Sequence, residues 1–321
     1  MKIHLFLCLF LVGLLGCSSD HSEKNIYSLV VSKNGKLVKE EYYNGKKKTD
    51  KLNVQSITKS IISLLTGIAI DKGFIESEET LVSQYFPESP FFSDENKNHI
   101  TVKHLLNHTA GFDWKGYKEH KGFLNSDQSY EFVLEKNLVA NPGASYNYNS
   151  GGTHLLSVIL TKATGMSTLD FANKYLFNPL AITSIEWKKL NDGYYDGAGL
   201  GLSMNSNDLL KIGQLVLNKG TFNSNQLISK TWMNKSFDES MKNNTKWGLR
   251  KSKHGFGWYS KTKDDEQILY SMGYGGQFIF ILPTTELIIV TTHNPDVPTG
   301  IEQQVDFIVE TFPALIEEFG G

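Results

Sequence analysis

Ser56-Ile57-Thr58-Lys59 stands at the start of an apolar run that extends to Ile70. The run is apolar on nearly all sides and is followed by Gly73, which predicts a buried helix from Ser56 to Lys72. Ser56 and Lys59 lie one turn apart on the same face of such a helix. A serine hydroxyl is a weak nucleophile that needs an adjacent base, and a partly neutral lysine can be that base.

The same spacing also has a purely structural interpretation. Ser56 would then cap a core helix with its hydroxyl, and Lys59 would extend its ammonium group to water. The spacing alone does not discriminate, because Ser260-Lys261-Thr262-Lys263 repeats it where no apolar helix follows. On this segment, both interpretations stay open.

The composition is that of a globular protein with one large domain or two modest ones, since 40% of the 321 residues are hydrophobic and 21% are charged. The net charge of −2 gives no electrostatic reason to expect a nucleic-acid partner. The oligomeric state is not predicted by any pattern in the chain.

The first residues predict a targeting segment. His4 to Leu15 is almost wholly apolar but too short to span a bilayer. It is followed by Gly16 and Cys17, which resembles the cleavage box of bacterial lipoproteins. We therefore expect residues 1–16 to be a signal peptide, Cys17 to carry the lipid anchor, and residues 17–26 to tether the protein in the bacterial cell envelope. The alternative is an ordinary secretory signal with a chance cysteine.

The remaining cysteine, Cys8, lies inside the predicted signal peptide. The mature chain would then have no thiol for a disulfide, a metal or a cysteine nucleophile. We expect no cofactor and no metal.

Strand patterns occur at both ends of the chain, with helical patterns between them. Strands are predicted at 27–31, 36–43, 255–261, 268–272, 277–282 and 287–292, and further helices at 101–107, 130–136, 153–163, 168–176, 207–219 and 300–319, with another beginning at 230–233. Asn34-Gly35 is a hairpin signal between the first two strands. The order predicts an α+β fold, an antiparallel sheet flanked by helices with a mostly helical region inserted at about 76–196.

Two further segments carry groups that acyl-transfer chemistry needs. Tyr148 lies in a turn-rich loop, 142–152, just before a helix, where it is either a proton carrier or a buried aromatic residue. Tyr274 lies among three glycines between two apolar strands. Its amide can approach a substrate oxygen there, unless the glycines only form a tight turn.

His104 and His108 stand four residues apart on a predicted helix, a spacing that can bind zinc. The glutamate of a zincin motif is absent after His104, and no third ligand is evident. Partly buried, hydrogen-bonded histidines are the simpler interpretation.

Taken together, these segments resemble the serine β-lactamase-like family, the group of class C β-lactamases, penicillin-binding esterases and 6-aminohexanoate-dimer hydrolases. The resemblance runs from about Tyr27 to the C-terminus, which makes 27–321 the expected hydrolase domain. It rests on an ordered set of segments: 55–60 (QSITKS), 100–111 (ITVKHLLNHTAG), 142–143 with Tyr148 and 151–152, 178–180 (NPL), 199–204 (GLGLSM) with 208–209, 255–258 (GFGW) and 273–277 (GYGGQ).

The resemblance implies a β-lactamase/transpeptidase-like fold and a role for each matching residue. Ser56 corresponds to the acylated nucleophile, Lys59 to its proton partner, and Tyr148 to the tyrosine that shares the acid–base work. The backbone amides of Ser56 and Tyr274 correspond to the oxyanion donors.

The sequence departs from the family pattern at two places. Ser150 replaces the asparagine of the Tyr-x-Asn motif, and Gly273-Tyr274-Gly275 carries no cation where β-lactamases have Lys-Thr-Gly or His-x-Gly. Both departures favour the 6-aminohexanoate-dimer hydrolase and esterase branch. Candidates for substrate contact are Ser150, Gly273, Gly275, Phe112, Trp114 and Trp187, of which the three aromatic residues could equally belong to the core.

We therefore expect a serine hydrolase that cleaves a small-molecule ester, amide or peptide through an acyl-enzyme on Ser56. A β-lactamase or a penicillin-binding protein that processes D-alanyl peptides is the alternative on the same fold. A non-catalytic ligand-binding lipoprotein is the alternative of another class, and loss of Ser56, Lys59 or Tyr148 would have favoured it.

Overall fold

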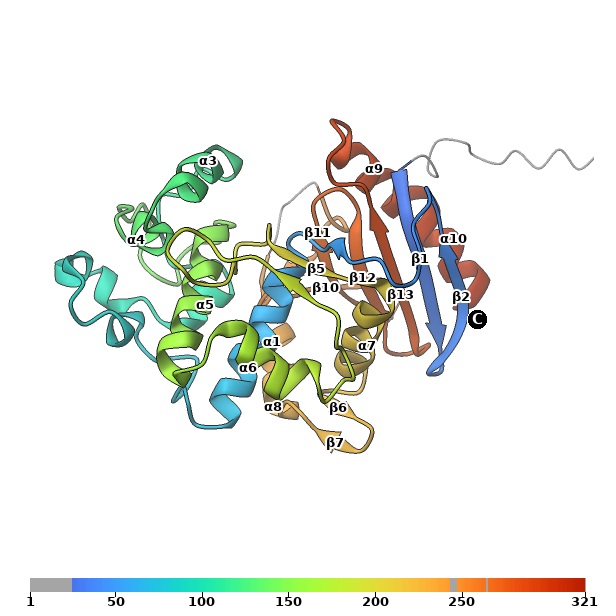
Figure 1. Ribbon diagram of the computed structural model, residues 1–321, viewed down its shortest axis with the longest axis horizontal. Helices are drawn as coiled ribbons and strands as arrows, with labels where there is room; N and C mark the ends of the chain where they lie inside the picture. Colours follow the sequence, from blue (N-terminus) through green and yellow to red (C-terminus); the bar gives the residue numbers. More distant parts are fainter. Residues whose placement is uncertain (1–24, 243–246, 264, 321) are drawn as a thin grey trace, which may run out of the picture.

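Eight antiparallel strands form the main sheet, which brings the two ends of the chain together (Figure 1). The computed structural model describes residues 25–242, 247–263 and 265–320. The strand order is β2-β1-β13-β12-β11-β10-β9-β8. The strands are β1 (Ile26–Lys33), β2 (Lys36–Tyr42), β8 (Met241–Lys242), β9 (Lys253–His254), β10 (Tyr259–Lys263), β11 (Glu266–Gly273), β12 (Gln277–Leu282) and β13 (Leu287–His293). The predicted α+β fold, with strands from both ends in one antiparallel sheet, is confirmed.

Both faces of this sheet are covered, so every residue of β12 and β13 is buried, and both strands are mostly apolar. Phe278 and Phe280 of β12 pack into one hydrophobic cluster, while Ile279 and Ile281 pack into the other. This alternation is the two-residue period of a strand between two layers.

Helices from different parts of the chain cover the two faces. The C-terminal segment, α9 (Gly300–Asp306), the π-helical turn η6 (Phe307–Thr311) and α10 (Phe312–Phe319), covers one face, whereas α7 (Ser206–Leu217) and α1 (Ile57–Asp71) lie on the other (Figure 1). Every residue of α1 from Ile57 to Ala69 is buried. The helix is therefore enclosed on all sides, as its all-round apolar pattern predicts.

A mostly helical region packs against the other side of α1, at the left of Figure 1. It contains α2 (Val102–Leu106), α3 (Tyr117–Asn125), α4 (Ser129–Leu134), α5 (Ser150–Thr164), α6 (Thr168–Ala172) and the π-helical turn η5 (Asn173–Phe177), preceded by the 3₁₀ turns η2 (Val82–Tyr85), η3 (Pro90–Ser93) and η4 (Lys97–His99). A small sheet of β3 (Leu52–Asn53), β5 (Leu202–Met204) and β4 (Glu186–Trp187) connects this region to α1. The remaining elements are β6 (Thr221–Phe222), β7 (Asn225–Gln226) and α8 (Lys230–Asp238).

Several elements differ from the sequence prediction. The strand predicted at 255–261 begins only at Tyr259, in β10, and the helix predicted at 168–176 continues as the π-helical turn η5 after Ala172. The patterns did not predict α3, because its charged sequence buries only Phe123. The C-terminal helix, predicted as one helix over 300–319, contains the π-helical turn η6 in its middle. The predicted signal peptide and Cys17 lie outside the described residues.

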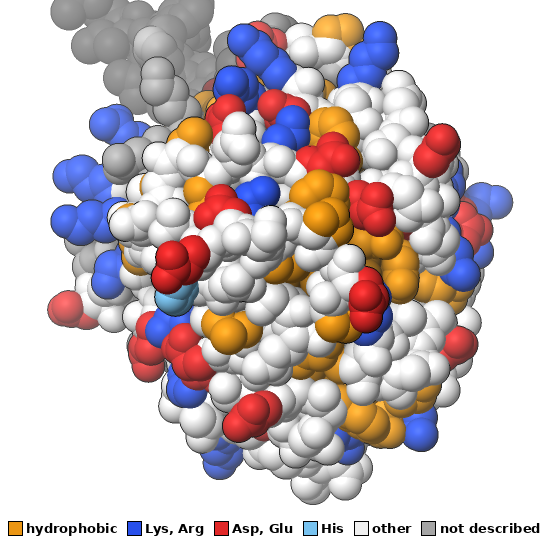
Figure 2. Space-filling model, turned by 90° about the vertical axis from the view of Figure 1, so that its left-hand side faces the viewer, with side chains coloured by type: hydrophobic (Ala, Val, Ile, Leu, Met, Phe, Trp, Pro, Cys, Tyr) orange, Lys and Arg blue, Asp and Glu red, His pale blue; other side chains and the backbone are white. Residues whose placement is uncertain are grey.

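Within the described ranges, each helix is too short or too polar to cross a membrane. Figure 2 shows the helical side of the molecule, where acidic and basic side chains are intermixed over the visible surface.

Candidate active site

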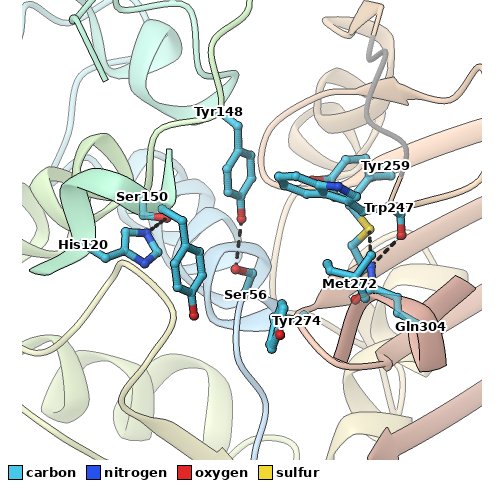
Figure 3. A pocket seen from close by; sticks show the side chains of 12 residues that line it. Ser56, His120, Tyr148, Ser150, Trp247, Tyr259, Met272, Tyr274 and Gln304 are labelled. Carbon is cyan, nitrogen blue, oxygen red and sulfur yellow. Dashed lines mark hydrogen bonds between the residues drawn. The ribbon is translucent and has the colours of Figure 1, made fainter. Parts of the chain in front are cut away.

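Ser56 occupies the N-cap position of α1, but its hydroxyl does not cap the helix. Instead, the Oγ atom accepts hydrogen bonds from Lys59 Nζ at 3.0 Å and from the Tyr148 hydroxyl at 2.9 Å. The capping interpretation is therefore wrong, and the three side chains form one hydrogen-bonded group. Figure 3 shows Tyr148 pointing at Ser56 from the opposite side of the pocket.

Lys59 does not reach the solvent, because only 3% of its surface is exposed. Its Nζ donates to Ser56 Oγ and to the backbone carbonyl of Ala198, and it lies 5.1 Å from the centroid of the Tyr148 ring. The snorkelling interpretation of Lys59 is thus excluded. The amine is held against the serine by contacts from three separate segments.

The loop that carries the Ala198 carbonyl is organised by one buried carboxylate. Asp196 is fully buried and accepts hydrogen bonds from the amides of Ala198 at 2.7 Å and of Leu200 and Gly201 at 2.6 Å each. Three backbone donors on one carboxylate fix the loop conformation, so that the Ala198 carbonyl stays directed at Lys59.

Tyr148 is positioned by the start of α5. The side chain of Asn149 caps that helix by accepting from the Gly152 amide at 2.9 Å, which fixes the chain directly after the tyrosine. On its other side, the Tyr148 ring packs on the imidazole of His108, with 4.6 Å between ring centroids. The hydroxyl is thereby held over Ser56.

The backbone amides of Ser56 and Tyr274 are the pair that the sequence predicts as oxyanion donors. Among the described residues, neither the Ser56 amide nor the Tyr274 amide has a hydrogen-bond acceptor. Gly273 brings the end of β11 against the segment before α1, since a Cβ atom there would lie 2.4 Å from the Val54 carbonyl oxygen and 3.0 Å from the Ser56 nitrogen. Glycine at this position therefore permits the close approach of Tyr274 to Ser56.

The histidines around the cluster are neutral. Burial and, to a smaller extent, the positive charge of Lys59 together lower the pKa of His254 to about 3. Burial lowers the pKa of His108 well below its ordinary value, with smaller contributions from His254 and Lys59 in the same direction. Their imidazole rings stack at 4.8 Å. The cluster is thus enclosed by uncharged aromatic groups.

Ser56 and Tyr148 open into a pocket of about 390 Å³. The pocket lies between the helical region and the main sheet, with His120 and Ser150 on one side and Trp247, Met272 and Gln304 on the other (Figure 3). The full lining is Ser56, Tyr117, His120, Tyr148, Ser150, Trp247, Tyr259, Met272, Gly273, Tyr274, Ile301 and Gln304.

Of the sequence-predicted contact residues, the structure places Ser150 and Gly273 at this pocket. Phe112, Trp114 and Trp187 are at most 7% exposed and belong to the main hydrophobic cluster, so their core interpretation is correct. Gly275 does not line the pocket, because it lies in the turn with its amide bonded to Gln304.

Most pocket residues missed by sequence reasoning come from segments that a local pattern does not connect to Ser56. His120 and Tyr117 lie on α3, which was not predicted, while Ile301 and Gln304 lie on the C-terminal helix. A histidine and a tyrosine at i and i+3 on a charged helix were the available signal on α3.

His104 and His108 bond to the backbone. His104 Nδ1 accepts from the Thr101 amide at 3.1 Å as part of a capping box, and His108 Nδ1 accepts from the Asn149 amide at 3.4 Å. Within the described ranges, no cluster of three potential metal ligands includes them. This agrees with the structural interpretation of the two residues.

The family model and the named relatives define the class of protein: a serine hydrolase. The sequence model of the Beta-lactamase family matches residues 26–308, so the chain belongs to this family. The family resemblance inferred from the ordered motifs is confirmed.

Relatives carry several functions. Penicillin-binding protein 4* of Bacillus subtilis is 30% identical over 141 residues, which cover 41% of this chain but only 30% of that protein. The 6-aminohexanoate-dimer hydrolase of Paenarthrobacter ureafaciens is 21% identical over 85% of this chain and 74% of its own length. Among solved structures, the penicillin-binding protein from Bacillus halodurans superposes with a TM-score of 0.68 at 16% identity, covering 92% of this chain and 98% of that one.

Proposed function

We propose that Ser56 is the nucleophile of this hydrolase and that it cleaves an ester or amide through an acyl-enzyme. The observation that carries the proposal is the pair of hydrogen bonds that Ser56 Oγ accepts from Lys59 and Tyr148. A nucleophile within hydrogen-bond reach of its proton acceptor is the arrangement that acyl transfer requires.

In the proposed reaction, Ser56 Oγ forms a bond to the substrate carbonyl carbon, and its proton passes to the Lys59–Tyr148 pair. The two groups share protons, because two protonated partners cannot serve as a base. The amides of Ser56 and Tyr274 stabilise the oxyanion. The carbon–oxygen or carbon–nitrogen bond then breaks, and Tyr148 returns the proton to the leaving group. In deacylation, the oxygen of a water molecule forms a bond to the acyl carbon and its proton passes to the Lys59–Tyr148 pair. The bond between that carbon and Ser56 Oγ then breaks, Ser56 regains a proton from the pair, and the carboxylic acid is released.

The test is covalent labelling. The wild-type protein should react with a fluorophosphonate probe, and the adduct should map to Ser56. Ser56→Ala should abolish labelling. Ser63→Ala is the matched control, because Ser63 is buried on the same helix and its hydroxyl has no hydrogen-bond partner within the described ranges. Undiminished labelling of Ser56→Ala would refute the assignment.

Within this proposal, the scissile bond is either an ester or an amide, and one comparison favours the amide. The relative named 6-aminohexanoate-dimer hydrolase aligns with 85% of this chain, which favours amides of small, linear substrates. A matched ester and amide with the same acyl group, assayed side by side, separate the two: the preferred class has the higher kcat/KM, and both activities disappear in Ser56→Ala.

We also propose that the protein is lipid-anchored through Cys17 at the bacterial cell envelope. The proposal rests on the apolar run that ends at Gly16-Cys17. The folded domain begins at Ile26, so that a tether of nine residues reaches about 30 Å at most. Cells that express the protein should incorporate an alkyne-tagged palmitate into it, and Cys17→Ser should remove the label. Equal labelling of both would exclude the anchor.

A further inference from the structure

We propose that the group bound beside Ser56 is uncharged and apolar, and that the pocket discriminates against substrates with a carboxylate or ammonium group next to the acyl carbon chain. The inference rests on the proposed function, since it names the substrate class of the same site. It is supported by the apolar side chains of the pocket wall, by the hydrogen bonds that Gln304 and Ser150 already form, and by the lack of charged side chains among the described lining residues.

Much of the pocket wall is formed by apolar and aromatic side chains. Tyr117, Trp247, Tyr259, Met272 and Ile301 line the pocket and come from separate parts of the fold. Tyr117 on α3 and Tyr274 at the end of β11 approach each other across it, with ring centroids 6.2 Å apart. Surfaces of this kind gain binding energy from apolar groups and offer a charge no partner.

Two polar side chains of the pocket lining, Gln304 and Ser150, already have hydrogen-bond partners within the protein. Gln304 accepts from the Gly275 amide at 3.1 Å and donates to the Trp247 carbonyl at 2.5 Å. Ser150 Oγ lies 3.3 Å from His120 Nε2. The side-chain amide of Gln304 and the hydroxyl of Ser150 are therefore already engaged within the protein before a substrate binds.

Charged side chains are absent from the described part of the pocket lining. None of the described lining residues is Lys, Arg, Asp or Glu. Burial and the positive charge of Lys59 lower the pKa of His120 to about 4, against an opposing contribution from Asp196, so the imidazole is neutral near pH 7. Lys59, behind Ser56, is occupied by Ser56 and Ala198. A substrate carboxylate in the pocket would lose water without gaining an ionic partner.

The experiment compares p-nitrophenyl esters with four-carbon acyl groups that differ in charge: butanoate, hemisuccinate and 4-aminobutanoate. The expected kcat/KM for butanoate exceeds the other two by about 100-fold. Hexanoate should exceed butanoate, with each buried CH₂ group contributing about fourfold. Charged and neutral esters within threefold of each other would overturn the inference.

A pair of variants tests the origin of the selectivity. Trp247→Lys places a cation at the pocket and should raise the ratio of kcat/KM for hemisuccinate over butanoate by about fivefold. Trp247 is 47% exposed, so the fold can accept this change. Val309→Lys adds the same charge at a residue that is 65% exposed and outside the pocket, and should leave the ratio unchanged. Equal ratios in both variants would contradict the inference.

A binding assay separates failure of the inference from failure of the proposed function. Trp247 is the exposed tryptophan, since Trp114, Trp187, Trp232 and Trp258 are at most 7% exposed. In Ser56→Ala, hexanamide should protect Trp247 from acrylamide quenching, whereas adipic acid monoamide at the same concentration should not. This result would support the apolar pocket even if no ester were cleaved, and equal protection by both amides would overturn it.

Discussion

The Lys59 side-chain amine donates a hydrogen bond to the backbone carbonyl of Ala198, 139 residues further along the chain. This contact joins the first turn of α1 to the loop before β5. It holds the amine within hydrogen-bond distance of Ser56, beside the Tyr148 ring, while the Tyr148 hydroxyl bonds to the same serine oxygen. The position of the proposed base thus depends on a loop that is far from it in the sequence.

Asp196→Asn should therefore reduce activity although Asp196 does not line the pocket. The asparagine amide group would face one or more backbone N–H donors of the loop, and the Ala198 carbonyl would lose its fixed direction. We expect kcat to fall about 100-fold with a smaller change in KM. Asp170→Asn, at an exposed helix cap, is the control. Unchanged kcat alongside a lower melting temperature would show a purely structural role for Asp196.

Tyr148→Phe removes the hydroxyl bonded to Ser56 but keeps the ring that packs on His108. We expect kcat to fall by about 100- to 10,000-fold, the range for loss of general acid–base catalysis, with little change in the free energy of unfolding. Tyr194→Phe removes a phenol outside the pocket and should leave both quantities unchanged. Near wild-type kcat for Tyr148→Phe would refute the role of the hydroxyl.

Gly273→Ala should displace the Tyr274 amide. The added Cβ atom would lie 2.4 Å from the Val54 carbonyl oxygen, so the backbone of β11 must move away from Ser56. We expect kcat to fall by about 100- to 1,000-fold, as for loss of one oxyanion donor. Gly152→Ala is the control, because its Cβ atom would meet only ordinary contacts of 3.6 Å or more. Steady-state kinetics of both folded variants check the prediction.

Stability should decrease as the pH falls below about 6.5, the ordinary histidine pKa. His108 and His254 have lowered pKa values in the folded protein, to about 3 for His254, so protons bind the unfolded state first. The stability they contribute is complete above pH 6.5 and is lost progressively toward pH 3. Each can lower the free energy of unfolding by up to about 1.4 kcal/mol per pH unit.

Urea unfolding between pH 5 and 7.5 measures this slope with little interference from carboxylates. His254→Phe retains an aromatic ring against Tyr259 but removes one titrating group, so the slope should decrease. His99→Asn changes an exposed histidine and should leave the slope unchanged. A slope in His254→Phe equal to that of the wild type would exclude His254 as a source of the pH dependence.

The elements with strong patterns were predictable from the sequence. The strand predicted at 277–282 matches β12 at both ends, because Gly276 and Pro283 mark where the strand must begin and end. The helix over 56–72 matches α1 to within one residue. Local spacing predicted that Ser56 and Lys59 share a helix face, and the ordered motifs predicted that Tyr148 lies beside them.

The remaining site residues depend on tertiary contacts that spacing does not encode. In the sequence, Asp196 resembles an ordinary loop aspartate, and its role becomes visible only when the amides of Ala198, Leu200 and Gly201 donate to its carboxylate. Trp187 and Trp247 have the same chemistry, yet one is in the core and the other at the pocket, since burial is decided by which segments pack on each. Gln304 reaches the pocket only because the C-terminal helix returns across the sheet.

The pairing of β1 with β13 also has a consequence for the way the chain is made. β1 lies between β2 and β13, with Ile26 opposite His293, so a ribosome must release almost the whole polypeptide before the N-terminal hairpin finds its neighbour. Contacts so distant in sequence form slowly. Until then, the apolar side chains of the hairpin remain uncovered, and the nascent protein depends on whatever shields them during synthesis.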